Sequence, residues 1–296
     1  MQPSMTALIS LFLRAYHTNR SVCPVFLDNV ARRLLTDEEY KAVESSMKNG
    51  REFFLPDFDG DDDAALDMTV NAYLAAPVIA RSEFCLEAFD CAKMRGVKQL
   101  VLLGSGYDSL PYRDDFDRKI RVFELDKKEV LEDKRRRLER AGIDFSHVSF
   151  VPCDLASNFE ASLLDAGFDG GTTAFCSMLG LCHYLKKEEL SSLLQKLGKI
   201  FPQGSDLVFD FPLKTQDTEP NTTETLASGA GESMKVRYSF SELESVLSKN
   251  GFRIYEYLEK NDIERRFFEK HNSFTSGTGL MAANGEFALC LAVNKN

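Results

Sequence analysis

The chain has 296 residues, 44% of them hydrophobic and 28% charged, which is the balance of an ordinary globular protein and excludes disorder, collagen and coiled coil as its main class. Its net charge of −10 disfavours nucleic acid and anionic membranes as partners, because both present negative phosphate. Scattered cysteines without a Cys-x-x-Cys pair, no leader-like N-terminus and no long apolar run predict a cytoplasmic protein with reduced thiols that does not enter a membrane.

Helical spacing of apolar residues dominates the first part of the chain. Leu8 and Leu11 share one helix face, and a longer apolar run extends from 65 to 94, where Pro77 is expected to split or kink the helix. We therefore predict an N-terminal helical cap over residues 1–95.

An acidic segment, 57–63, resembles the start of a calcium-binding EF-hand loop. A loop beginning at Asp57 would place Met68 at the last ligand position, where a bidentate glutamate is required. We interpret the segment as a solvated loop and expect no metal.

From Lys98 onward, short β-rich runs alternate with helical stretches. Such an alternation predicts parallel strands joined by crossover helices in one doubly wound α/β sheet, within a second unit covering residues 96–296. The predicted strands are 99–103, 120–125, 148–151, 173–178, 206–211, 252–258 and 286–293, and the clearest helices are 127–141, 186–200 and 240–249. Residues 216–231 are rich in Thr, Gly, Glu and Ser and poor in apolar anchors, which predicts either a mobile lid within an insertion at about 212–238 or a plain surface connection.

Two further patterns have simple interpretations. The basic run from Lys134 to Arg137 has acidic neighbours on its helix, so we interpret it as a solvated face rather than a nucleic-acid patch. The predicted buried free thiols, whose spacing is too wide for a zinc knuckle, are Cys85, Cys91, Cys176 and Cys182.

The first predicted strand runs into a Gly-x-Gly turn formed by Gly104 and Gly106. Glycine lets the backbone adopt positive φ and lets a ligand approach closely, although an ordinary strand-to-helix turn can have the same residues.

Asp126 ends the second strand twenty residues after Gly106, where an acid can bind ribose hydroxyls or, alternatively, cap the following helix. Asp154 ends the third strand, where a carboxylate could accept the adenine amine. Asp108 disfavours a pyrophosphate, because the two negative groups would repel by about 1 kcal/mol in water and about 4 kcal/mol near a protein surface. The pattern fits the adenosine of S-adenosylmethionine better than a dinucleotide.

At these residues the chain resembles the leucine carboxyl methyltransferase family of class I S-adenosylmethionine-dependent methyltransferases, which includes polyketide O-methyltransferases. The segment from Gly104 to Arg113 is similar to the family's GAGLDTRAYR motif. Phe123-Glu124-Leu125-Asp126 and the residues after it are similar to its FEVDxPEVxxxKR motif, and Asp154-Leu155 matches its DL pair. The resemblance implies a mostly parallel seven-stranded sheet with a helical cap and a lid insertion.

The resemblance also implies roles for individual residues. Arg81 stands where the family has an arginine that holds the methionine carboxylate of the cofactor. The family's EGLLMYL motif corresponds here to Leu179-Gly180-Leu181-Cys182-His183-Tyr184-Leu185. Leu179 stands in place of the family's acid, and Tyr184 matches its tyrosine. Leu110 and Pro111 replace the usual Arg-Ala. The implied cofactor-binding set is Arg81, Gly104, Gly106, Asp126, Asp154 and Leu155.

Methyl transfer to oxygen is an in-line displacement that requires positioning and exclusion of water rather than a metal. A carboxylate acceptor is already a nucleophile, whereas a hydroxyl acceptor benefits from a general base. His183 is the best-placed histidine for that base, unless it only packs against the next helix, and Tyr184 either contacts the substrate or packs.

We therefore expect a methyltransferase acting on a carboxylate or hydroxyl of a small molecule or a peptide terminus. The substitution at Leu179 motivates an alternative, a catalytically inactive nucleoside-binding or regulatory module of the same fold. A nicotinamide oxidoreductase is disfavoured by Asp108 and Ser109. The acceptor and the oligomeric state stay open at this point.

Overall fold

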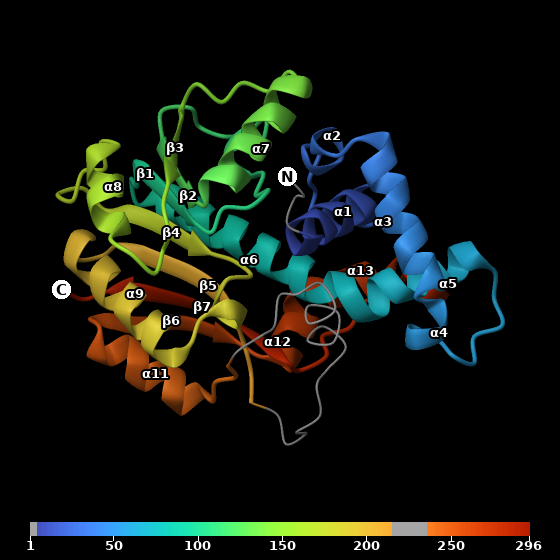
Figure 1. The fold of residues 1–296 in the computed structure, drawn as a ribbon. Helices are drawn as coiled ribbons and strands as arrows, with labels where there is room; N and C mark the ends of the chain where they lie inside the picture. The colour runs from blue at the N-terminus through green and yellow to red at the C-terminus, as the bar shows by residue number, and fades with distance from the viewer. Residues whose placement is uncertain (1–4, 215–235) are drawn as a thin grey trace.

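Seven strands form one sheet in the order β3-β2-β1-β4-β5-β7-β6 in the computed structural model, which describes residues 5–214 and 236–296 (Figure 1). Only β7 runs antiparallel to its neighbours β5 and β6, and the other described pairs are parallel. The strands are β1 Gln99–Leu103, β2 Arg121–Asp126, β3 Val148–Pro152, β4 Ala174–Met178, β5 Asp206–Pro212, β6 Phe252–Leu258 and β7 Phe287–Asn294. The predicted doubly wound, mostly parallel, seven-stranded sheet is confirmed, with strand ends within one residue of prediction.

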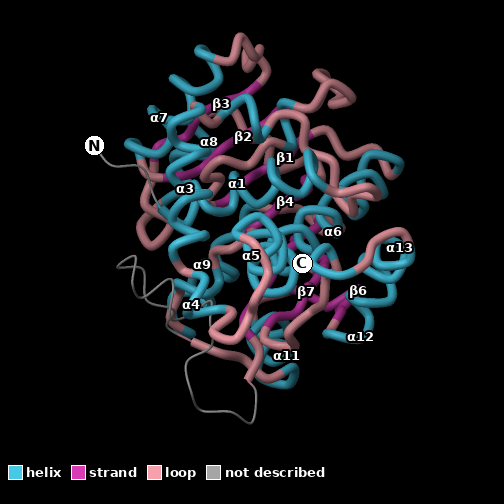
Figure 2. The backbone as a smooth tube through the Cα atoms, turned by 90° about the vertical axis from the view of Figure 1, so that its right-hand side faces the viewer, coloured by secondary structure: helices cyan, strands magenta, loops and turns pink. Residues whose placement is uncertain are grey.

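Burial on both faces explains why the central strands are mostly apolar. In β1, Leu100 and Leu102 belong to the apolar cluster on the side of the cap, whereas Val101 and Leu103 belong to the cluster on the opposite face. Successive side chains of a strand point to opposite faces, so both faces need helices to cover them. Figure 2 shows helices on both sides of the strands.

Helix α6 packs against β4, β5 and β7, while α8, α9 and α11 supply apolar residues to the opposite face. The helices after β1 are α7 Lys128–Arg140, α8 Phe159–Asp165, α9 Lys187–Ile200, α11 Phe240–Lys249, α12 Lys260–Ile263 and α13 Glu269–Ser273, with short turns at Leu110–Tyr112, Cys182–Tyr184, Glu264–Phe268 and Gly277–Gly279. Most of the predicted lid, including all of 216–231, lies outside the described residues. No helix among those described is long and apolar enough to cross a membrane.

The described residues before β1 form the helices α1 Met5–Arg20, α2 Ala31–Leu34, α3 Asp37–Asn49, α4 Arg51–Phe54, α5 Asp62–Met68 and α6 Ala75–Met94. A π-helical segment, Thr69–Leu74, joins α5 to α6 just before Pro77, which lies in the first turn of α6. Proline lacks an amide hydrogen and crowds the preceding turn, so a widened turn at this point relieves the clash. Because α6 also packs on the sheet, the division into 1–95 and 96–296 stays a prediction.

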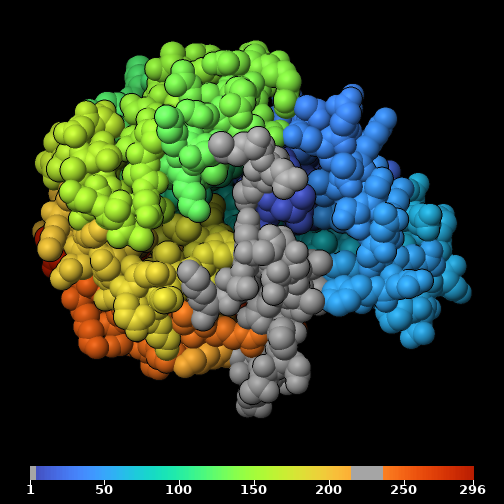
Figure 3. Space-filling model, in the orientation of Figure 1, coloured from blue at the N-terminus to red at the C-terminus, as the bar shows by residue number. Residues whose placement is uncertain are grey.

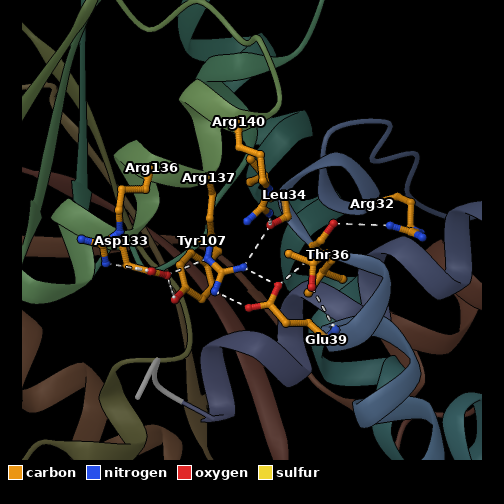
Figure 4. A network of polar contacts seen from close by, with 10 residues as sticks. Arg32, Leu34, Thr36, Glu39, Tyr107, Asp133, Arg136, Arg137 and Arg140 are labelled. Atoms are coloured by element: carbon orange, nitrogen blue, oxygen red, sulfur yellow. Dashed lines mark hydrogen bonds and ion pairs between the residues drawn. The ribbon is translucent and has the colours of Figure 1, made fainter. Parts of the chain in front are cut away.

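Arg137 of α7 ties the sheet to the cap (Figure 4). Its guanidinium donates two hydrogen bonds of 2.7 Å to the carboxylate of Glu39 in α3 and one of 2.6 Å to Asp133. It also lies over the ring of Tyr107, whose hydroxyl donates to Asp133 at 2.6 Å. The surfaces of the cap and of α7 adjoin in the space-filling view (Figure 3).

Two details differ from prediction. The basic run of α7 is not wholly solvated, because Lys134 and Arg137 are buried and paired with carboxylates; Lys134 contacts Glu124 at 2.7 Å. Cys91 is exposed, although the other three cysteines of its predicted set are buried.

Candidate functional site

The turn after β1 is built by backbone hydrogen bonds to the neighbouring strand. The amides of Gly104 and Ser105 donate to the carbonyl oxygen of Leu125 in β2 at 2.8 and 3.2 Å. Gly104 and Gly106 have φ of +62° and +42°, in the left-handed region that side chains rarely adopt. A Cβ on Gly104 would lie 3.2 Å from Leu181, so a larger residue there would press on that side chain in addition to straining the backbone.

Asp126 connects this turn to the end of β2. Its carboxylate accepts hydrogen bonds from the amides of Gly106 at 2.8 Å and Lys127 at 2.7 Å. Burial raises the pKa of Asp126, and these two amides oppose that rise by stabilising the charged form. Helix α7 begins at Lys128 without a side-chain cap, so the contacts of Asp126 are with the glycine turn and the residue after it.

Asp154 and Leu155 follow β3 at the same edge of the sheet. The amide of Cys153 donates to the carbonyl oxygen of Asp126 at 2.9 Å, which brings the two strand ends together. Asp154 is exposed and accepts from the amide of Ala156 at 3.0 Å, while Leu155 is partly buried. Burial, then the charges of Asp126 and Asp154, raise the pKa of Cys153 to about 11.

A second group of polar side chains gathers around Asp210, an acid within the apolar strand β5. Its carboxylate accepts from Arg81 at 3.1 Å, from the imidazole of His183 at 3.1 Å and from the amide of Gly180 at 2.6 Å. Asp210 is only 1% exposed, against 15% for Arg81 and 12% for His183. Burial alone would raise the pKa of Asp210, but the charge of Arg81 and the hydrogen bonds from His183 and Gly180 hold it well below its usual value.

Sequence reasoning selected Arg81, His183 and Tyr184 but missed Asp210, the group to which two of them bind. Tyr184 is the neighbour of His183 in the short turn after β4, and their ring centroids are 6.4 Å apart. Gly180 has φ +66°, and a Cβ there would lie 2.9 Å from the Arg81 guanidinium. The available signal for Asp210 was a lone acid between apolar strand residues.

The cap also reaches the glycine turn, through Arg14 of α1. Arg14 donates to Asp28 at 2.7 Å, to the hydroxyl of Ser109 at 2.8 Å and to the carbonyl oxygen of Tyr107 at 2.7 Å. Arg14 and Asp28 are both buried, at 8% and 0% side-chain exposure. The loop that begins with the two glycines is therefore fixed from the cap side as well as from the sheet.

These groups suit a ligand with a sugar and a charged tail. The Asp126 carboxylate and the glycine turn meet at one strand end, and the cation of Arg81 and a buried imidazole nitrogen lie past the neighbouring strand β4. There is open space where a side chain of Gly106 would lie, since among the described residues a Cβ there would meet only Ala7 and the Gly104 carbonyl oxygen, both at 3.9 Å. The site thus combines a close backbone approach with acceptors for hydroxyl groups and a cation for an anion.

Comparisons with known sequences give a family and a class of enzyme. The sequence model described as leucine carboxyl methyltransferase matches residues 7–198. The chain is 31% identical over 280 residues to YktD of Bacillus subtilis (strain 168), a candidate S-adenosyl-L-methionine-dependent methyltransferase, with 90% of this chain and 92% of that protein covered. It is 29% identical over 201 residues to Rv1896c of Mycobacterium tuberculosis (strain ATCC 25618 / H37Rv), a candidate of the same class, covering 68% and 61% of the two chains.

Among solved structures, a candidate methyltransferase from Thermobifida fusca YX is similar with a TM-score of 0.58 and 14% identity, covering 100% of this chain and 96% of that one. A protein of family DUF574 from Streptomyces avermitilis MA-4680 is similar with a TM-score of 0.54 and 16% identity, covering 85% and 97%. At these identities the likeness concerns the fold alone.

Proposed function

The chain belongs to the leucine carboxyl methyltransferase family and is an S-adenosylmethionine-dependent methyltransferase with the class I fold, and we propose that it methylates an oxygen, either a carboxylate or a hydroxyl, of a small molecule or a peptide terminus. The observation that carries the proposal is that two polar groups lie at the turns that follow the paired strands β1 and β4. The Asp126 carboxylate lies on the glycine turn, and Arg81 with His183 surrounds Asp210.

The proposed cofactor contacts follow from the chemistry of these groups. Asp126 accepts from the ribose hydroxyls, because its carboxylate retains lone pairs beyond the two amides it already binds. The adenine lies near Asp154 and Leu155 at the end of β3. The positive-φ turn at Gly104 and Gly106 allows the backbone to approach the cofactor.

At the other end, Arg81 binds the methionine carboxylate. Its partners are Asp210 and, at 3.4 Å, the hydroxyl of Ser10, which use two of the five N–H groups of the guanidinium and leave the others to donate to a carboxylate.

S-adenosylmethionine supplies a methyl group on a positively charged sulfur when bound. His183 removes the proton of a hydroxyl acceptor, and Tyr184 contacts the acceptor and orients it. The partly buried turn that carries both side chains excludes water that would compete for the acceptor's lone pair.

Leu179, where the resemblance has an acid, is partly buried against apolar core residues. The carboxylate of Asp210 lies 2.6 Å from the amide of the next residue, Gly180. A negative charge is therefore supplied beside this position from β5, which supports activity rather than the regulatory module.

The test is calorimetry with S-adenosylmethionine, followed by transfer of a labelled methyl group to matched hydroxyl and carboxylate acceptors. Asp126→Asn is expected to raise the Kd by roughly 10- to 150-fold, because a charge-assisted hydrogen bond contributes about 1.5–3 kcal/mol. Asp165→Asn, at an exposed position in α8, is the matched control and leaves the Kd unchanged. Binding by the wild-type protein without transfer to any oxygen acceptor would contradict the proposal and support the regulatory module.

A further inference from the structure

Asp210 determines which nitrogen of His183 carries a proton. The carboxylate is held in its charged form by Arg81 and by the Gly180 amide, so it acts only as an acceptor. The imidazole Nε2 lies 3.1 Å from Oδ2 of Asp210 and must therefore be the protonated nitrogen. In the neutral ring the lone pair is then left on Nδ1.

Nδ1 of His183 is the atom left for chemistry. It is buried and has no hydrogen-bond partner among the described residues. Nearly all buried polar atoms in folded proteins are satisfied, so an orphaned nitrogen at the end of β4 calls for a partner that binds there. That partner must be a hydrogen-bond donor, because the tautomer leaves Nδ1 as an acceptor.

The need for a donor at Nδ1 separates the two candidate acceptors. Arg81 is the cation in contact with Asp210, so the pair is balanced in charge and the discrimination rests on the proton. A hydroxyl carries a proton that it can donate to Nδ1, whereas an ionised carboxylate carries none.

We propose that Asp210 is a positioning residue that orients His183 so that Nδ1 takes the proton of a hydroxyl acceptor, and that the oxygen methylated by this enzyme is a hydroxyl rather than a carboxylate. This inference rests on the proposed function and names the acceptor class for the same site. The acceptor oxygen forms the new bond to the methyl carbon as the carbon–sulfur bond breaks. The electron pair of that bond stays on sulfur, the hydroxyl proton goes to Nδ1, and solvent takes it from the imidazolium afterwards.

Arg81 and His183 share the same oxygen, Oδ2 of Asp210, each at 3.1 Å. Any change in the Arg81 contact therefore acts on the same oxygen that accepts from Nε2–H of His183.

The first experiment measures the tautomer directly, by ¹⁵N–¹H correlation NMR of the imidazoles in the protein bound to S-adenosylhomocysteine. We expect His183 protonated on Nε2, and a shift toward the Nδ1–H form in Asp210→Asn, whose amide can donate to Nε2. Asp206→Asn is the matched control, since Asp206 lies on the same strand and pairs with Arg95 instead. An Nδ1–H tautomer in the wild-type protein would overturn the proposal.

The second experiment compares methyl transfer to 4-methylphenol, 4-nitrophenol and 4-methylbenzoate. We expect transfer to the phenols, and a fall in kcat of about 10²-fold or more for Asp210→Asn and for His183→Gln with 4-methylphenol. The fall is smaller with 4-nitrophenol, which ionises without help, and KM for S-adenosylmethionine changes less than kcat. His183→Gln keeps the Arg81 and Gly180 contacts of Asp210, so it reports on the base even if Asp210→Asn does not fold.

Transfer to 4-methylbenzoate alone, or an Asp210→Asn enzyme with full kcat on 4-methylphenol, would overturn the inference while leaving an oxygen methyltransferase intact. If the enzyme methylates neither these three probes nor any other acceptor in a panel of hydroxyls and carboxylates, the result counts against the proposed function instead. The tautomer measurement still decides the positioning role in that case.

Discussion

Replacing Arg137 by alanine is expected to loosen the cap from the sheet and to destabilise the fold. The guanidinium is 4% exposed and holds Glu39 and Asp133, whose side chains are 25% and 23% exposed. Breaking a fully buried ion pair costs about 3–5 kcal/mol. Because water can reach both carboxylates in part, we expect a loss of about 2–3 kcal/mol, a large share of the roughly 5–15 kcal/mol that stabilises a folded protein.

Arg136 provides a matched control on the same helix. Its side chain is 63% exposed and makes one contact, 3.1 Å to Asp133. Arg136→Ala should change the free energy of unfolding by no more than about 0.5 kcal/mol. Urea unfolding and thermal unfolding, both followed by circular dichroism, measure the two variants. The melting temperature is expected to fall by roughly 3–5 °C for Arg137→Ala only, since 296 residues unfold with an entropy of about 0.6 kcal/mol/K.

A double-mutant cycle between Arg137 and Glu39 separates their pairing from the loss of packing. We expect a coupling energy of at least about 1 kcal/mol for this pair and close to zero between Arg136 and Asp133. Equal stability of Arg137→Ala and Arg136→Ala would refute the reasoning, because the buried ion pairs of Arg137 would then contribute no more to stability than the exposed pair of Arg136.

Three further outcomes are expected. In calorimetry, Arg81→Ala should raise the Kd for S-adenosylhomocysteine about tenfold or more. The Kd for 5′-methylthioadenosine, which lacks the methionine carboxylate, should stay unchanged. Equal weakening of both ligands would show that Arg81 does not bind that carboxylate. Burial, then repulsion from Glu87, raises the pKa of Glu83 from 4.5 to about 7. The folded protein is therefore fully stable with respect to this group below about pH 4.5, where the carboxyl is neutral, and loses stability as the pH rises through 7. Glu83→Gln should therefore raise the free energy of unfolding by about 1 kcal/mol at pH 8, after discounting for partial exposure, and leave it unchanged at pH 4; no gain at pH 8 would argue against a buried charge. Cys91 should react first with a thiol reagent in the native protein, whereas buried Cys176, whose pKa burial raises, should react only after unfolding; simultaneous modification would contradict the burial pattern.

The strands and the glycine turn could be predicted because their signals are local. Buried strands such as β1 are unbroken apolar runs, and the spacing from Gly106 to Asp126 follows from one strand–helix–strand unit. The contact of Arg81 with Asp210 joins residues 129 positions apart, and that of Arg137 with Glu39 joins residues 98 apart. Neither pairing leaves a periodic trace in the sequence, which is why burial of Arg137 and the contacts of Asp210 became visible only in the fold.

The position of β7 has a consequence for how the molecule assembles. Although β7 is the last strand of the chain, it lies between β5 and β6 in the sheet, and among the described strands β6 pairs with β7 alone. The sheet therefore cannot be completed in the order of synthesis. A chain that ends before Phe287 leaves the fully buried strand β5 with an open edge and β6 with no strand beside it. An unpaired apolar edge of this kind is a template for association with other chains, so incomplete copies of this protein should aggregate rather than accumulate as folded fragments.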